Sequence, residues 1–305
     1  MSTTGEAYPI MFHPRSMPRP KVPAGLRVSR ARTLLVSVAP LLSLGVLHTT
    51  GTVAAPAPPA QHPAGAGAHA SVQPRETARV SAAVVGLDGG SRKPVLYGAD
   101  TRYDTASIVK VDVLAALLLR AQDAGRPLSA QERALAEPMI RKSDNAAANA
   151  LWRTIGRAPG LEAANKRLGL TSTQGGEGTR WGLTRTTASD QIRLLLSVFD
   201  DTAAAKARSP LNDASRTYIR TLMSRVASDQ TWGVSSASGA AYELKNGWLQ
   251  RTASGLWDVN SVGRITVDGH RYLVTVLSEG STTMSDGVSL VERTARQAVS
   301  ATAHA

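Results

Sequence analysis

The segment Ile108–Leu119 constrains the fold of this chain more than any other part of the sequence. It is almost wholly apolar and rich in leucine, and its length suits a helix of about three turns. A helix that is apolar on all sides has to be buried. We therefore expect a central helix around which the rest of the domain is folded.

The patterns on either side of this helix predict an α+β domain. Alternating apolar runs bounded by turn residues predict strands, and apolar residues at helical spacing predict helices. The strands of both ends of the domain would form one antiparallel sheet, flanked by the helices. Strands are expected at 80–87, 94–98, 261–267 and 271–277, and further helices at 130–141, 145–155, 189–199, 213–226 and 284–299.

The first 55 residues have the pattern of a secretory signal. A stretch with three arginines precedes the apolar run Thr33–Leu47, and the small residues Val53–Ala55 follow it. A basic stretch, a short apolar core and a small-residue site together are typical of a cleaved signal. We expect a secreted or extracytoplasmic protein, cleaved after Ala55. The alternative is an uncleaved membrane anchor, which the short run and Pro40 disfavour.

Residues 56–78 are rich in Pro, Ala and Gly and predict a flexible linker, which leaves a folded domain at 79–303. Residues 1–75 hold seven Lys and Arg against one acid, and the rest of the chain holds 28 against 22. The body shows no basic cluster on any one element, so we expect no nucleic-acid partner. The chain has no Cys, which excludes disulfides, but about 230 residues are enough for a stable core.

Several kinds of catalytic site are excluded. His270 is the only histidine in the body and lies beside a turn, whereas a Ser-His-Asp triad needs a His oriented by a buried acid. There is no Gly-x-Ser-x-Gly elbow, no pair of zinc ligands and no glycine-rich phosphate loop. If the chain is a hydrolase, its base should be a lysine or a carboxylate, with no metal or cofactor.

Three short motifs offer such a chemistry: Ser107–Lys110, Ser143–Asn145 and Lys245–Gly247. Lys110 follows Ser107 by one helical turn, so its amine can reach the hydroxyl. Its apolar neighbours favour the neutral, basic form of the amine. The N–H of Ser107, at the positive end of the helix, can face a developing oxyanion.

The other two motifs supply the groups that acyl transfer from an amide still needs. Ser143 would pass a proton to the leaving nitrogen, Asn145 would bind the substrate amide, and Lys245 would attract a substrate carboxylate. Each motif also has a purely structural interpretation. Ser107 and Ser143–Asn145 suit helix N-caps, and the Asn-Gly pair of Lys245–Gly247 suits a tight hairpin turn.

In this order, the three motifs resemble those of the class A β-lactamase-related serine hydrolases, which belong to the penicillin-recognising serine enzymes. The resemblance spans residues 80–302 and includes the flanks in Asp104–Lys110 and Ser143–Leu151, as well as Arg185–Asp190. It implies a β-lactamase/transpeptidase-like fold with a compact all-helical subdomain, and an acyl-enzyme at Ser107. It also implies a second oxyanion N–H at Trp248.

Two departures from that family pattern bear on turnover. The family's deacylating base is a Glu between the second and third motifs, and here the only acid of segment 171–185 is Glu177. Asn246 replaces a Thr whose hydroxyl, in the family, holds the substrate carboxylate. By the resemblance we expect Lys245, Asn246 and Gly247 to bind the substrate. If Glu177 is not a base, the acyl-enzyme would persist.

Three functions therefore stay open. The first is a β-lactamase-like hydrolase of β-lactam amides. The second is a D-Ala-D-Ala carboxypeptidase, or penicillin-binding protein, with slow deacylation. The third is a catalytically weak member that binds cell-wall fragments or a protein partner. We expect a monomer whose ligand is a β-lactam or a peptidoglycan stem peptide, in transient contact with the cell wall.

Overall fold

The computed structural model describes residues 78–89, 92–239 and 241–303. The expected leader, and the expected linker except for its last residue, lie outside these ranges. Within these ranges, the first element is β1 (Arg79–Gly86). Among the described residues, no helix combines the length and the apolar character needed to cross a membrane.

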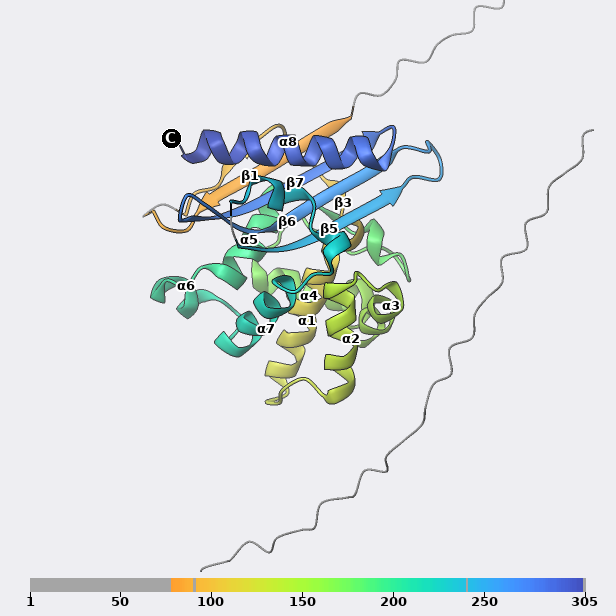
Figure 1. Ribbon diagram of the computed structural model, residues 1–305. Coiled ribbons are helices and arrows are strands. Elements are labelled where there is room, and N and C mark those ends of the chain that lie inside the picture. The colour runs from red at the N-terminus through yellow and green to blue at the C-terminus, as the bar shows by residue number, and fades with distance from the viewer. Residues whose placement is uncertain (1–77, 90–91, 240, 304–305) are drawn as a thin grey trace, which may run out of the picture. The chain divides into compact units, whose positions relative to one another are not determined.

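A five-stranded antiparallel sheet is built from both ends of the domain, as the sequence predicts (Figure 1). β1 pairs with β7 along the whole length of β1, so the first and last strands of the described domain lie side by side. A separate two-stranded sheet joins β3 (Tyr103–Asp104) to β4 (Arg185–Thr186). The order in the large sheet is β2 (Val95–Tyr97), β1, β7 (His270–Ser281), β6 (Trp257–Val267) and β5 (Tyr242–Gln250).

Helices cover both faces of the large sheet. The last helix, α8 (Met284–Ala303), lies along one face, and the other α-helices gather on the opposite side (Figure 1). These are α1 (Val109–Asp123), α2 (Ala130–Arg141), α3 (Asn145–Thr154), α4 (Arg157–Leu168), α5 (Ala188–Phe199), α6 (Ala203–Arg208) and α7 (Asp213–Met223). Short 3-10 helices are η1 (Ala106–Ile108), η2 (Trp181–Leu183), η3 (Ser228–Gln230) and η4 (Gly233–Ala237).

The predicted apolar helix is the centre of the helical layer. α1 is buried along nearly its whole length and contacts α2, α3, α4 and α7. Burying each of its leucines contributes roughly 1.5–3 kcal/mol, so this one helix supplies a large share of the core. A second apolar cluster lies between the sheet and α8. The start of α1 is therefore held rigidly, and Ser107 lies there.

Two helices were not predicted, and α4 shows why. It contains Pro159 and Gly160, a pair that normally indicates a turn. Pro159 lies in the first helical turn, where its missing N–H costs no hydrogen bond. Gly160 is required by packing, because a Cβ there would lie 1.6 Å from the carbonyl oxygen of Ile155. Tertiary contact thus overrides the local turn signal.

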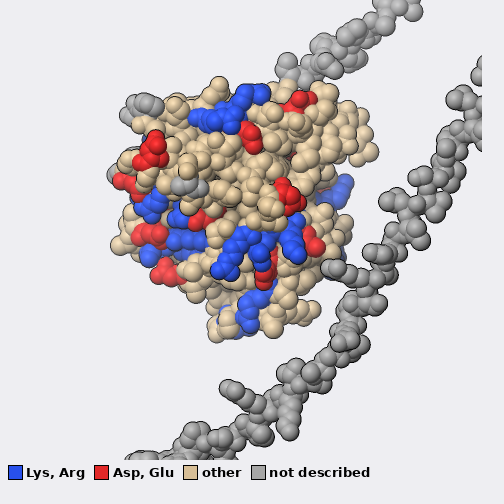
Figure 2. Space-filling model, in the orientation of Figure 1, with Lys and Arg blue, Asp and Glu red and all other residues tan. Residues whose placement is uncertain are grey.

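The charged surface is mixed rather than uniformly basic. On the face shown in Figure 2, Lys and Arg side chains gather mainly on the helical side, with acidic groups among them. One cluster pairs Arg216 and Arg220 with Asp201, and Arg216 also with Asp213. Much of the excess positive charge is therefore locally compensated.

Candidate active site

The three sequence motifs meet at the hydroxyl of Ser143. Lys110 Nζ lies 3.1 Å from Ser143 Oγ, and Lys245 Nζ lies 2.9 Å from the same oxygen. Lys110 also donates to the carbonyl oxygen of Ser143 at 2.6 Å and to Oδ1 of Asn145 at 2.8 Å. Segments far apart in the sequence therefore share one hydrogen-bond network.

Ser107 lies beside this network and keeps its hydroxyl free. It occupies the middle of η1, directly before α1, and is half-buried. Its Oγ makes no hydrogen bond with any residue in the described part of the chain, and in particular none with Lys110. The expected contact between amine and hydroxyl is therefore absent, although the two residues lie one turn apart on the same helical segment. The hydroxyl of Ser107 is therefore free to contact a substrate, one helical turn before the buried amine of Lys110.

Gly247 brings strand β5 against the backbone of Ser107. A Cβ at Gly247 would lie 2.7 Å from the amide nitrogen of Ser107 and 2.8 Å from that of Ile108. Only glycine permits this approach. The next residue, Trp248, directs its ring to the other face of the sheet, where it lies 5.8 Å from the ring of Trp232. The use of its backbone N–H as an oxyanion donor stays a prediction.

Burial makes both lysines unusually weak bases. Lys110 has no exposed surface, and burial lowers its pKa to about 7, although the nearby carboxylate of Asp144 acts in the opposite direction. Burial also holds the pKa of Lys245 well below its usual value, and the charge of Lys110 lowers it further. At neutral pH, a large fraction of Lys110 is therefore uncharged and able to accept a proton.

The backbone next to both serines is held in an uncommon conformation. Ala106, directly before Ser107, has φ 46°, and Ser143 has φ 55°. Residues in the left-handed region cost of order 1–3 kcal/mol each and persist only where the surroundings hold them. At Ser143, the Lys110 amine holds both the carbonyl and the hydroxyl.

Asn260 holds the turn that leads to Ser107. Its side chain is fully buried, and its Nδ2 donates to the carbonyl oxygens of Asp104 at 2.8 Å and Thr105 at 3.1 Å. Its Oδ1 accepts from the backbone N–H of Ser278 at 3.0 Å. The sequence interpretation missed this residue. Its only signal is an Asn, a poor strand former, directly before the predicted strand at 261–267.

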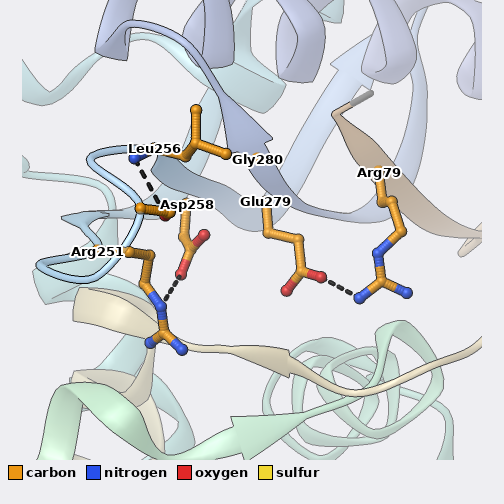
Figure 3. A pocket seen from close by; sticks show the side chains of 7 residues that line it. Arg79, Arg251, Leu256, Asp258, Glu279 and Gly280 are labelled. Atoms are coloured by element: carbon orange, nitrogen blue, oxygen red, sulfur yellow. Dashed lines mark hydrogen bonds and ion pairs between the residues drawn. The ribbon is translucent and has the colours of Figure 1, made fainter. Parts of the chain in front are cut away.

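A cavity of about 260 Å³ is lined by the charged side chains of Arg79, Arg251, Asp258 and Glu279 (Figure 3). Arg251, which lines the cavity, pairs with Asp104 and lies 3.7 Å from Asp258, and Arg79 pairs with Glu279. Burial raises the pKa of Asp258 to about 7, in spite of Arg251. None of the three motifs lines this cavity. Its ion pairs anchor the strand that leads to Ser107.

The side chain of Asn145 contacts the lysine network, and that of Asn246 does not. Asn145 is exposed at the start of α3, and its Nδ2 makes no hydrogen bond within the described residues, so it is available to a ligand. Asn246 is buried on the opposite face of β5 from Lys245. Its Nδ2 donates to the carbonyl oxygens of Gln230 and Trp232, both at 2.9 Å, and its Oδ1 accepts from Ser261 at 2.6 Å. The expected substrate-binding role of Asn246 is therefore replaced by a structural one.

Glu177, the one acid of segment 171–185, lies away from the lysine network. Its side chain is 87% exposed and forms an ion pair with Arg180 at 2.7 Å. It makes no contact with the lysine network. Instead, the ring of Trp181 lies over that network, with its centroid 4.8 Å from Lys110 Nζ. None of the three hydrogen bonds that Lys110 makes is with a carboxylate.

Within the described ranges there is no group of three or more His, Cys, Asp or Glu side chains that could hold a metal ion.

The sequence matches a known protein family. Residues 127–302, more than half of the chain, match the β-lactamase enzyme family. This match begins after the first motif, so Ser107 and Lys110 lie outside it. No match was found among curated proteins.

Solved structures share the fold at low sequence identity. A mutant of PBP-A, solved as an acyl-enzyme complex with penicillin G, is 21% identical, with a TM-score of 0.61 over 76% of this chain and 92% of that one. The TLA-1 extended-spectrum β-lactamase is 16% identical, with a TM-score of 0.61 over 73% and 91%. A β-lactamase from Chitinophaga pinensis is 16% identical, with a TM-score of 0.63 over 73% and 94%. The chain belongs to the β-lactamase enzyme family, among the penicillin-recognising serine enzymes.

Proposed function

We propose that this protein is a serine hydrolase that forms an acyl-enzyme between Ser107 and β-lactam amides. One observation carries the proposal: the hydroxyl of Ser143 is held between the amines of Lys110 and Lys245, beside the unbonded hydroxyl of Ser107. A nucleophile, a weakly basic amine and a proton-donating hydroxyl are the groups that amide cleavage needs.

In the acylation step, Ser107 Oγ attacks the carbonyl carbon of the amide and its proton passes to the neutral amine of Lys110. The N–H of Ser107 stabilises the oxyanion, and the N–H of Trp248 is the proposed second donor. Ser143 then gives its proton to the leaving nitrogen as the C–N bond breaks. Ser143 recovers a proton from the lysine network, to which it is already hydrogen-bonded.

Lys245 is suited to recognise a substrate carboxylate next to Ser143. Its amine is buried and donates to Ser143 Oγ and, at 2.8 Å, to the carbonyl oxygen of Asn246. A carboxylate brought to this place would favour the charged form of the amine. Both β-lactams and peptides ending in D-Ala-D-Ala carry such a group, so the site fits either.

We propose further that deacylation is slow, as in a penicillin-binding D-Ala-D-Ala carboxypeptidase. Deacylation needs a base within hydrogen-bond reach of the attacking water. Glu177 is exposed and paired with Arg180, and no carboxylate bonds to Lys110. This observation favours the peptidase over a fast β-lactamase.

Two assays separate the candidate functions. Turnover of a chromogenic cephalosporin and release of D-alanine from an acyl-D-Ala-D-Ala peptide would be measured on the same purified protein. We expect slow peptide cleavage and little cephalosporin turnover beyond one equivalent. Fast cephalosporin turnover would identify a β-lactamase and contradict slow deacylation. Inertness in both assays would favour a binding protein without catalysis.

We also propose that the protein acts outside the cytoplasm. The proposal is supported by the basic stretch, the apolar run Thr33–Leu47 and the small residues up to Ala55. The mass of the protein recovered from the native cells and from their medium tests it. A chain that begins at Pro56 in the medium is expected, and a full-length chain retained in the cytoplasm would contradict export.

A further inference from the structure

The indole of Trp181 covers the amine of Lys110. The ring centroid lies 4.8 Å from Lys110 Nζ. Its Nε1 donates to Oδ1 of Asn149, one turn into α3, at 2.7 Å. The backbone just beyond η2 is tied to the segment of Ser107, because the N–H of Thr105 donates to the carbonyl oxygen of Thr184 at 2.8 Å. The ring is therefore fixed over the amine from two sides.

Lys110 is closed off from solvent on its polar side as well. Its amine lies within hydrogen-bond distance of two oxygens of Ser143 and of Oδ1 of Asn145, so protein atoms occupy this side of the group. With the ring of Trp181 over the remaining side, the residue has no accessible surface. A water molecule can approach the amine only if one of these groups moves.

This enclosure matters after acylation of Ser107. To hydrolyse the ester, a water oxygen must attack the carbonyl carbon while its proton passes to a base within about 3 Å. Lys110 is the base at hand, because its three hydrogen-bond partners include no carboxylate. When the bond between the carbonyl carbon and Ser107 Oγ then breaks, the serine recovers its proton from the Lys110 ammonium, so atoms and charges balance.

We propose that Trp181 keeps hydrolytic water away from Lys110 and thereby sets the lifetime of the acyl-enzyme. The inference rests on the proposed acylation of Ser107. Trp181 is a positioning residue, since it takes no part in bond making. Segment 171–185, where the family has its deacylating Glu, places the ring of Trp181 over Lys110 and thereby excludes water.

Three variants of the full-length protein test the proposal. Each is acylated with benzylpenicillin, freed of excess reagent, and followed by intact mass as the adduct is lost. Trp181→Ala opens the face of Lys110 and should shorten the adduct lifetime about 100-fold, the lower end of the usual range of general-base catalysis. Trp181→Phe keeps a flat ring over the amine and should restore most of the lifetime. Asn149→Ala, at an exposed position, frees the indole and should shorten the lifetime by an intermediate factor.

The pH dependence distinguishes water access from general loosening. In Trp181→Ala, the rate of adduct loss should rise with pH as Lys110 becomes neutral, and then level off. Loss that is faster by the same factor at every pH would show a loosened structure and overturn the inference.

Two outcomes distinguish a failure of this inference from a failure of the proposed acylation of Ser107. Equal adduct lifetimes in the wild type, Trp181→Ala and Asn149→Ala would overturn the role of Trp181 and leave acylation standing. If Trp181→Ala does not fold, the comparison of Asn149→Ala with the wild type decides. No adduct on the wild-type protein would overturn both acylation and the inference.

Discussion

Asp112 is a carboxyl group in the middle of the apolar helix α1, with no cation beside it. The residue is fully buried, and its Oδ1 accepts from Nε2 of Gln191 at 3.2 Å. Its Oδ2 and the Oε1 of Gln191 are both buried without a hydrogen-bond partner in the described part of the chain. A proton on Asp112 would supply the donor that this pair of side chains lacks.

Protonation of Asp112 should therefore make the stability of the protein depend on pH. Burial raises its pKa from 3.8 to about 7, the hydrogen bond from Gln191 opposes this, and the charge of Asp190 adds to it. The unfolded chain loses this proton near pH 4 and the folded chain keeps it to about pH 7. The contribution is thus fully present below pH 4 and is lost as the pH rises to 7. A difference of about three pKa units corresponds to about 4 kcal/mol.

Replacement of Asp112 by Asn removes the titration and tests this reasoning. The free energy of unfolding of both proteins would be measured in urea from pH 4 to pH 8, and their difference plotted against pH. The other carboxyl groups titrate in both proteins, so their contributions cancel in the difference between the two free energies of unfolding. The wild type should lose about 4 kcal/mol relative to Asp112→Asn across this range. A difference that does not change with pH would refute the assignment.

Three further predictions concern the active site. The acylation rate should rise about tenfold per pH unit below pH 7 and level off above it, because neutral Lys110 is the base. Lys110→Ala should lower the acylation rate about 10²- to 10⁴-fold, and an unchanged circular dichroism spectrum would show that the variant still folds. Gly247→Ala should slow acylation while the protein still folds, because the new Cβ would push β5 away from the N–H of Ser107; acylation rates and thermal melts would show both effects. Asn260→Ala leaves two buried carbonyl oxygens without their hydrogen-bond donor. The free energy of unfolding, measured in urea, should fall by about 1–3 kcal/mol for each of these groups, and acylation should also be slower.

The sequence predicted the layers of the fold because they depend on periodicity. The apolar stretch of α1 and the alternating strands β6 and β7 are strong patterns. The short strands β3 and β4 have two residues each, too few for a pattern. The hairpin-turn interpretation of Lys245–Gly247 was wrong, because nine consecutive residues of β5 pair with β6 and override the local Asn-Gly preference.

The site was predicted in part for a similar reason. Motif spacing identified the residues that meet at Ser143, but successive strand residues point to opposite faces, so Lys245 and Asn246 do not face the same pocket. That error could have been avoided from the strand period alone. The place of Trp181 over Lys110 could not be predicted, because it depends on how the loop packs across α3.

The most direct test of the account is to locate the covalent adduct. The purified protein would be incubated with benzylpenicillin, digested, and mapped by tandem mass spectrometry beside Ser107→Ala. The account predicts a single penicilloyl group on the peptide that contains Ser107, at that side chain, and none on the variant. An adduct on another residue, or an equal adduct on Ser107→Ala, would contradict it.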